Sequence, residues 1–118
     1  MSESVPGSVT IASEALVTIV RLAAQEIPGV HEMRADWARD VNRFLGNTQV
    51  GEGVRVRVHD NNQVSVDLFV VVDHDVNMLQ LGRRVQIEIT RAIEEMLGMG
   101  VREVNVHIED VFFPPIEA

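Results

Sequence analysis

The densest cluster of side chains that could do chemistry is Asp73-His74-Asp75. Carboxylates and imidazole rings bind metal ions, but three adjacent side chains rarely converge on one ion, and no second group of ligands follows at helical spacing. We therefore interpret the segment as the end of a strand, with Asp75 as the N-cap of the helix that follows. No metal site is predicted.

His59 and His107 are further candidates for proton chemistry. Both fall on the outward side of predicted strands, because the residues around them alternate between apolar and polar. We interpret them as exposed histidines on the surface of a sheet, where they could be neighbours. A contact between two such rings would respond to pH near neutrality.

The sequence lacks the motifs that are typical of covalent catalysis and of nucleotide binding. The chain has no cysteine, and none of its serines lies in a nucleophile-elbow sequence. No glycine-rich phosphate-binding pattern occurs, since residues 51–53 and 98–100 are typical of a loop and of a helix end. We predict that the protein is not an enzyme and uses no cofactor.

Nucleic-acid binding is the alternative function. Trp37, with Arg34, Arg39 and Arg43, forms the only basic and aromatic stretch. A KH-like module would also combine helices with a small sheet, but it needs a G-x-x-G loop, which this chain lacks. The net charge of −8 further opposes contact with phosphates. We therefore expect no nucleic-acid partner. A small nucleic-acid-binding module with a KH-like layout is kept only as the second choice of function.

The length of 118 residues is enough for one domain with one hydrophobic core. We predict a single domain over 1–118, with an ordered part of about 8–113. The longest apolar run, 68–72, is far shorter than the ~20 residues of a membrane-spanning helix. The acidic first residues lack the basic and apolar regions of a secretory signal. We expect a cytoplasmic protein that does not insert directly into a membrane.

Hydrophobic periodicity predicts the elements that position these side chains. Residues 54–72 alternate as a β-hairpin, with 60–63 as a turn rich in Asn and Asp. We also predict a helix over 14–26 capped by Ser13, a helix over 76–97 ended by Gly98, a strand over 101–109, and weaker strands over 8–11 and 30–35. Residues 36–45 fit a short helix or an ordered loop.

Together these elements predict an α+β fold. It has two layers, with a three- to four-stranded mixed sheet and two main helices packed on one face. The last strand follows a crossover helix, so it could lie parallel to a hairpin strand. The stripe of the second helix expected to face the sheet consists of Met78, Gly82, Val85, Ile89, Ala92, Ile93 and Met96.

Apolar residues and glycines in four stretches carry a resemblance to a known family. The stretches are 9–16, 26–30, 53–72, and 94–98 leading into 104–108. Over 9–111 the chain resembles the alkaline shock protein family, although Asp73-His74 stand where relatives usually have Tyr-Gly. The resemblance implies a cytoplasmic, non-enzymatic and self-associating protein of the general or envelope stress response. In some relatives, a partner that carries a membrane anchor places the protein beside the membrane.

The second strand of the hairpin is apolar on both faces at its end. Phe69 and Val71 lie on the side that should face outward. Either this end is buried within its own chain, or a second copy covers it. We favour the second copy, because few residues remain to cover the second sheet face, and we predict a self-association face of Phe69, Val71, Phe112 and Phe113.

The predicted function is that of a self-associating structural or scaffold protein of the envelope or general stress response. Its mechanism would be binding rather than chemistry. Its partners would be other copies of itself and a membrane-anchoring protein.

Overall fold

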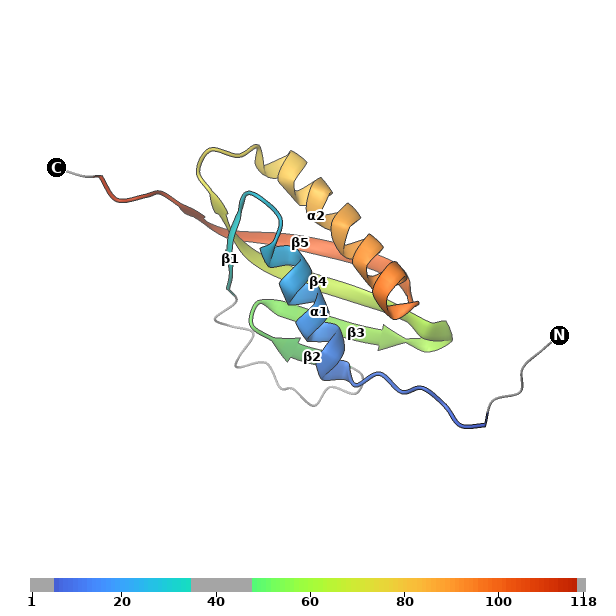
Figure 1. The fold of residues 1–118 in the computed structure, drawn as a ribbon. Helices are drawn as coiled ribbons and strands as arrows, with labels where there is room; N and C mark the ends of the chain where they lie inside the picture. Colours follow the sequence, from blue (N-terminus) through green and yellow to red (C-terminus); the bar gives the residue numbers. More distant parts are fainter. Residues whose placement is uncertain (1–5, 35–47, 117–118) are drawn as a thin grey trace.

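The structure is a computed structural model that describes residues 6–34 and 48–116 (Figure 1). Its helices are α1 (Ser13–Gln25) and α2 (Met78–Ala92), and α2 continues into a π-helical turn at Ile93–Leu97. Its strands are β1 (Val30–Met33), β2 (Thr48–Gly51), β3 (Val54–His59), β4 (Gln63–Asp73) and β5 (Gly100–Phe112). The predicted segment 36–45 with Trp37 lies outside the described residues.

β4 is the central strand of one mixed sheet. It pairs antiparallel with β3 along its first half and with β1 near its end, while β5 runs parallel beside almost its whole length. The fold class is confirmed, including the parallel last strand. Among the described residues the sheet has five strands rather than three or four, because Thr48–Gly51 pairs with β3 as β2.

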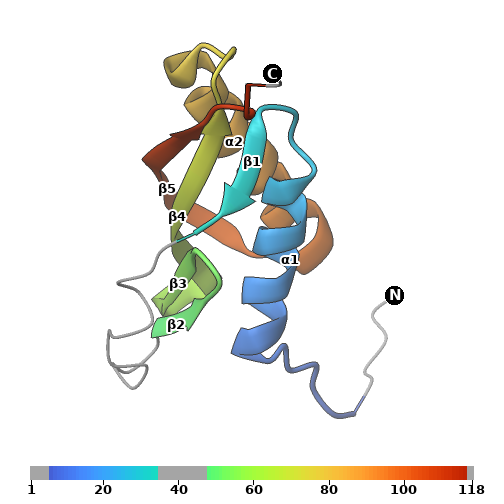
Figure 2. The ribbon, with the colours of Figure 1, turned by 90° about the vertical axis from the view of Figure 1, so that its left-hand side faces the viewer.

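Both helices cover the same face of the sheet, which leaves a two-layer arrangement (Figure 2). Alternate residues of β4 point into the layer between sheet and helices, as the period of two requires. They are Val64, Val66, Leu68, Val70 and Val72, and they belong to one apolar core with residues of both helices. Burying each such side chain contributes about 1.5–3 kcal/mol before conformational entropy is counted.

The hairpin turn and the end of α2 form as their residue types predict. Asn61 and Asn62 have φ values of 64° and 59°, a region that asparagine tolerates better than most residues. Gly98 ends the helical segment in the left-handed conformation, with φ of 67°. The weak strand signal near residue 30 is confirmed as β1.

The starts of both helices differ from the prediction. Residues 8–11 form no strand. The N-cap position of α1 is Ala12 rather than Ser13, and no side chain caps it. The cap of α2 is Asn77 rather than Asp75, and its side-chain oxygen accepts a hydrogen bond from the N–H of Gln80 at 2.9 Å. Two extra residues therefore separate the end of β4 from α2.

The buried stripe of the second helical segment is also shifted from the predicted one. Leu81, Val85, Ile89 and Ile93 are buried, each one turn after the last. Leu81 was missing from the predicted stripe, whereas Met96 was included and is exposed. The residues that face the sheet thus follow one another at intervals of four, and Met96 near the end of the segment points to solvent.

Candidate functional site on the second face of the sheet

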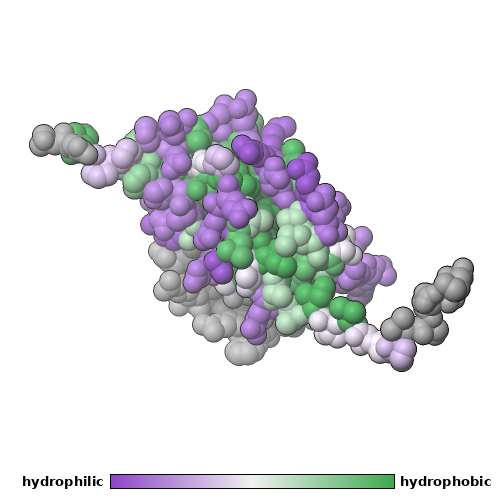
Figure 3. Space-filling model, in the orientation of Figure 1, coloured by the Kyte–Doolittle hydropathy of each residue, from purple (hydrophilic) through white to green (hydrophobic). Residues whose placement is uncertain are grey.

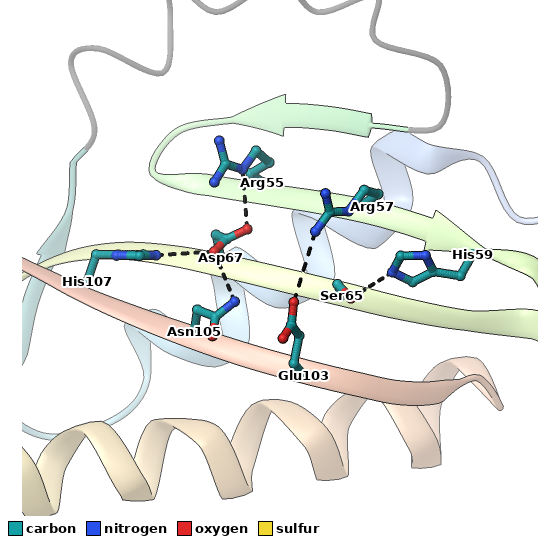
Figure 4. A network of polar contacts seen from close by, with 8 residues as sticks. All are labelled: Arg55, Arg57, His59, Ser65, Asp67, Glu103, Asn105 and His107. Atoms are coloured by element: carbon teal, nitrogen blue, oxygen red, sulfur yellow. Dashed lines mark hydrogen bonds and ion pairs between the residues drawn. The ribbon is translucent and has the colours of Figure 1, made fainter.

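The side of the sheet opposite α1 and α2, called the second face below, carries most of the polar side chains of the strands. Cross-strand pairing places Arg55 beside Asp67 and Asp67 beside Asn105. The adjacent row holds Arg57 and Glu103 on either side of β4 (Figure 4). Each row contains one residue from β3, one from β4 and one from β5, because outward positions recur every second residue on each strand.

Asp67 is the centre of this polar cluster. Its carboxylate accepts hydrogen bonds from Arg55 Nε at 3.2 Å, from Asn105 Nδ2 at 3.2 Å and from His107 Nε2 at 3.1 Å (Figure 4). Only 8% of the residue is exposed. The buried carboxylate is therefore held by donors from both neighbouring strands, the arrangement that makes a buried charge tolerable.

The pKa of Asp67 lies below its ordinary value because two opposing effects do not cancel. Burial alone would raise the pKa of Asp67, since it disfavours the charged form. The hydrogen bond from His107, the positive charge of Arg55 and the bonds from Arg55 and Asn105 lower that pKa by more. Asp67 is consequently ionised at neutral pH and acts as an acceptor only.

Other side chains of the second face are paired in the same way. Ser65 Oγ and His59 Nε2 are hydrogen-bonded at 2.7 Å. Arg57 and Glu103 face each other across β4 at 4.0 Å. The buried serine is thus already engaged, and its 2% exposure keeps it away from any substrate.

Near the C-terminal end of β4, an ion pair on the second face connects Arg34, which follows β1, with Asp110 of β5. Arg34 follows β1, and its backbone N–H donates to the carbonyl oxygen of Phe69. Its guanidinium donates to Asp110 of β5 at 2.8 Å, and Asp110 is the register partner of Val71. A hydrogen bond from the N–H of Val111, together with Arg34, holds the pKa of Asp110 below its ordinary value.

Two more histidines lie near this end. His31 Nδ1 approaches Asp73 Oδ1 to 3.3 Å, and its ring stacks on Phe112 with 3.8 Å between ring centroids. His74 stacks on Phe113 at 5.3 Å. Phe112 and Phe113 of the predicted self-association face therefore contact histidine rings of their own chain.

The structure corrects the expectation that Phe69 and Val71 are left for a second copy to cover. They are 2% and 3% exposed. Phe69 stacks on His107 at 4.6 Å, and Arg55 lies 5.8 Å from its ring centroid. Phe112 is half-buried, and Phe113 is 69% exposed. Of the four predicted residues, only Phe113 presents most of its surface to solvent.

His59 and His107 are not neighbours. They pair with Gln63 and Phe69 respectively, six residues apart on β4, which corresponds to roughly 20 Å. Each has its own hydrogen-bond partner instead, Ser65 and Asp67. The common outward side of the strands was predicted correctly, but the register along them separates the two rings.

Sequence reasoning missed the central role of Asp67. A usable signal existed in the valines of the two hairpin strands over 54–66, which all have even residue numbers. Residues opposite each other in a hairpin point to the same face, so even-numbered residues must pair with even-numbered ones and odd with odd. The observed register, with His59 opposite Gln63, has this property and brings Arg55 opposite Asp67. The contacts to Asn105 and His107 had no such local signal.

The chemistry of the second face is that of a saturated polar network. Among the described residues, no buried side-chain nitrogen or oxygen lacks a hydrogen-bond partner, and no group of three or more His, Asp or Glu residues could hold a metal ion. The two described cavities lie along α2, away from this network. Across 6–34 and 48–116, neither helix is long and apolar enough to cross a bilayer.

Comparison with known proteins gives the same fold and a family. The chain is 15% identical to a MamM CTD variant in its zinc form, with a TM-score of 0.51 over 85% of this chain and 87% of that one. Another MamM CTD structure is 16% identical, with a TM-score of 0.51 over 84% of this chain and 99% of that one. At these identities the likeness concerns the fold alone.

Sequence relatives are more informative. YqhY of Bacillus subtilis (strain 168), whose name assigns no function, is 33% identical over 107 residues, which cover 91% of this chain and 78% of YqhY. A stress response regulator gls24 homolog of Streptococcus pyogenes serotype M1 is 25% identical over 94% of this chain. The match spans 62% of that regulator. These names point to a stress-related role.

The profile of the alkaline shock, gls24-like family matches residues 1–113, and this family is described as having a cell envelope-related function. The match covers almost the whole chain, including all strands and both helices of the described fold. The chain therefore belongs to the alkaline shock protein family, with a stress- or envelope-related role.

Proposed function

We propose that this protein is a non-enzymatic, self-associating scaffold of the stress or envelope response. The observation that carries the proposal is the saturation of the second face, where Arg55, Asp67, Asn105 and His107 satisfy one another. Side chains engaged in this way stabilise strand pairing and are not free to bind or transform a substrate. Family membership supports the same conclusion, because the names of the relatives describe stress response and no reaction.

Binding through apolar surface is the mechanism we propose. The helix side of the molecule exposes an apolar patch over α1 within a mostly polar surface (Figure 3). Ile11 and Leu22 contribute to it with 41% and 49% exposure, and Leu79 and Ile87 of α2 are exposed as well. Exposed apolar surface that is rimmed by polar residues is typical of interaction sites.

The cellular setting belongs to the same proposal. The protein would act in the cytoplasm, without inserting into the membrane, and a partner that carries an anchor would bring it to the envelope. The nucleic-acid alternative gains no support, because Arg55 and Arg57 are engaged with Asp67 and Glu103 and the net charge is −8.

Light scattering after size exclusion tests self-association. The purified chain is measured across a dilution series and at two salt concentrations. We expect a defined or growing assembly that resists salt, because burial of apolar surface is not screened by ions whereas exposed ion pairs are. A monomer at every concentration would refute the scaffold function.

A further inference from the structure

β5 forms a long open edge of the sheet. With 13 residues it is the longest described strand, and in the part of the sheet that is described it pairs only with β4. The strands at the opposite edge, β1 and β2, have four residues each. A strand edge presents unpaired N–H and C=O groups, and short edge strands limit that exposure whereas a long one invites pairing with another strand.

A hydrogen bond from α2 shows which backbone groups of β5 face outward. Gln86 Nε2 donates to the carbonyl oxygen of Val104 at 3.0 Å. In a parallel pair, alternate residues direct their backbone groups to the same neighbour, so Val104, Val106 and Ile108 share one direction. Because α2 already meets the carbonyl of Val104, we assign this set to the open edge. Gln86 covers one of these carbonyls.

An apolar groove runs along the same edge, between α2 and β5. Its volume is about 530 Å³, and its lining residues are Met78, Leu79, Gly82, Arg83, Gln86, Val106 and Ile108. Leu79 is 66% exposed and Ile108 is 36% exposed. The absence of a side chain at Gly82 leaves space beside them. The groove can therefore receive apolar side chains from a strand that pairs with β5.

The charges of β5 indicate which strand fits this edge. Arg102 and Glu103 lie near its start, and Glu109 and Asp110 lie near its end. These ends flank a regular stretch, 103–108, because the register with β4 skips Arg102 and Glu109. A second β5 in antiparallel orientation would set each Arg102 opposite Asp110 of the other strand and each Glu103 opposite Glu109, so that one attractive pair offsets one repulsive pair. A parallel arrangement would bring only like charges together.

We propose that two copies of this chain associate through their β5 edges, in antiparallel orientation, so that one sheet continues across both. This proposal rests on the self-association proposed above and names its surface. Antiparallel pairing of outward-facing residues keeps the apolar face of each strand on the helix side. A register centred on Val106 sets Val104 opposite Ile108, and the exposed side chain of Ile108 enters the groove beside α2 of the other copy.

A charged substitution at the edge tests the surface. Ile108→Lys places an ammonium group in the groove, and we expect it to weaken dimerisation at least tenfold by sedimentation or light scattering. Val9→Lys is the matched control, because it also replaces an exposed apolar residue by lysine. Val9 precedes α1, which packs beside β2 at the opposite edge of the sheet from β5. The control should leave the association unchanged. Denaturant unfolding of both variants verifies that they fold.

Charge exchange tests the orientation without altering the groove. Arg102→Glu should weaken the dimer several-fold, because it sets acidic groups against acidic groups. The double variant Arg102→Glu/Glu109→Arg should restore the affinity, because the new arginine lies opposite Glu103 of the other strand and this attraction replaces the lost one. Asp110 is left unchanged, because its ion pair with Arg34 serves the fold.

Crosslinking tests proximity directly, because the natural chain has no cysteine. Val106→Cys lies at the proposed two-fold axis and should form a disulfide-linked dimer under mild oxidation at low micromolar concentration. Val9→Cys, at an exposed position away from β5, should not. A dimer that tolerates Ile108→Lys and fails to crosslink at residue 106 would overturn the β5 interface while leaving self-association intact. A strictly monomeric natural chain would instead refute both proposals.

Discussion

Asp67 is the single residue on which most polar contacts of the second face converge. Three donors from β3 and β5 reach its carboxylate, and their effect on its pKa outweighs that of burial. We expect Asp67→Asn to lower the free energy of unfolding by about 1–3 kcal/mol at pH 7, because the donors lose a charged acceptor. Chemical denaturation measures this loss.

The same residue predicts a pH dependence. A carboxyl whose pKa is lower in the folded state stabilises the fold above its unfolded pKa of about 3.9, and this contribution is lost as pH falls through the folded pKa. The difference in unfolding free energy between the natural chain and Asp67→Asn should therefore narrow in acid below about pH 4. A difference that stays constant down to pH 2 would contradict the lowered pKa of Asp67.

The junction of β1, β4 and the turn between β2 and β3 depends on Gly53. Its φ is +74°, and a Cβ atom there would lie 2.8 Å from the backbone nitrogen of Arg34 and 2.9 Å from the carbonyl oxygen of Phe69. Backbone atoms cannot move aside as a flexible side chain can. We expect Gly53→Ala to destabilise the fold by about 3 kcal/mol or more, since conformational strain and a steric clash add.

Gly98 provides the matched control for this prediction. Its φ of +67° is similar, but nothing lies within 4 Å of the position that its Cβ would occupy. Gly98→Ala should therefore cost only the conformational strain, about 1 kcal/mol. Equal losses for the two variants in thermal or urea unfolding would show that the close approach at Gly53 has no energetic consequence.

At the scale of the whole molecule, the packing of several strands around Phe69 determines that this residue stabilises the fold. Its N–H donates to Gly53 and its carbonyl accepts from Arg34. Since its ring is buried within the chain, we expect Phe69→Ala to lower the unfolding free energy by about 3–5 kcal/mol. Phe69→Glu should likewise unfold the domain rather than only dissociate an assembly, because it would place a charged group in a buried position.

Phe113 is the comparison for Phe69 in the same experiment. It is 69% exposed and stacks on His74 near the end of the described chain. Phe113→Ala should change the unfolding free energy by less than about 0.5 kcal/mol. If Phe69→Ala were as mild as Phe113→Ala, and lowered the oligomer mass instead, the second face would be an interface between copies.

Local residue patterns predicted the elements well and their junctions poorly. The alternating valines of β3 and β4 were sufficient to predict the hairpin, and the asparagines at its turn adopt the positive φ values expected of them. The N-cap of α2 was assigned to Asp75 rather than Asn77, because both residue types cap helices and only the packed structure selects between them. β2 was missed because the sequence of residues 48–51 has only a weak strand pattern. These residues become a strand through their pairing with β3.

The sequence by itself determined the α+β fold and the sides of each strand, because periods of two and of nearly four residues are local properties of the chain. Only the tertiary structure decided which outward side chains meet. Asp67 and Asn105 are 38 residues apart, and their contact depends on the parallel register of β4 and β5 with its two irregularities. The burial of Phe69 and the open edge of β5 depend in the same way on contacts between distant segments, which no local period encodes.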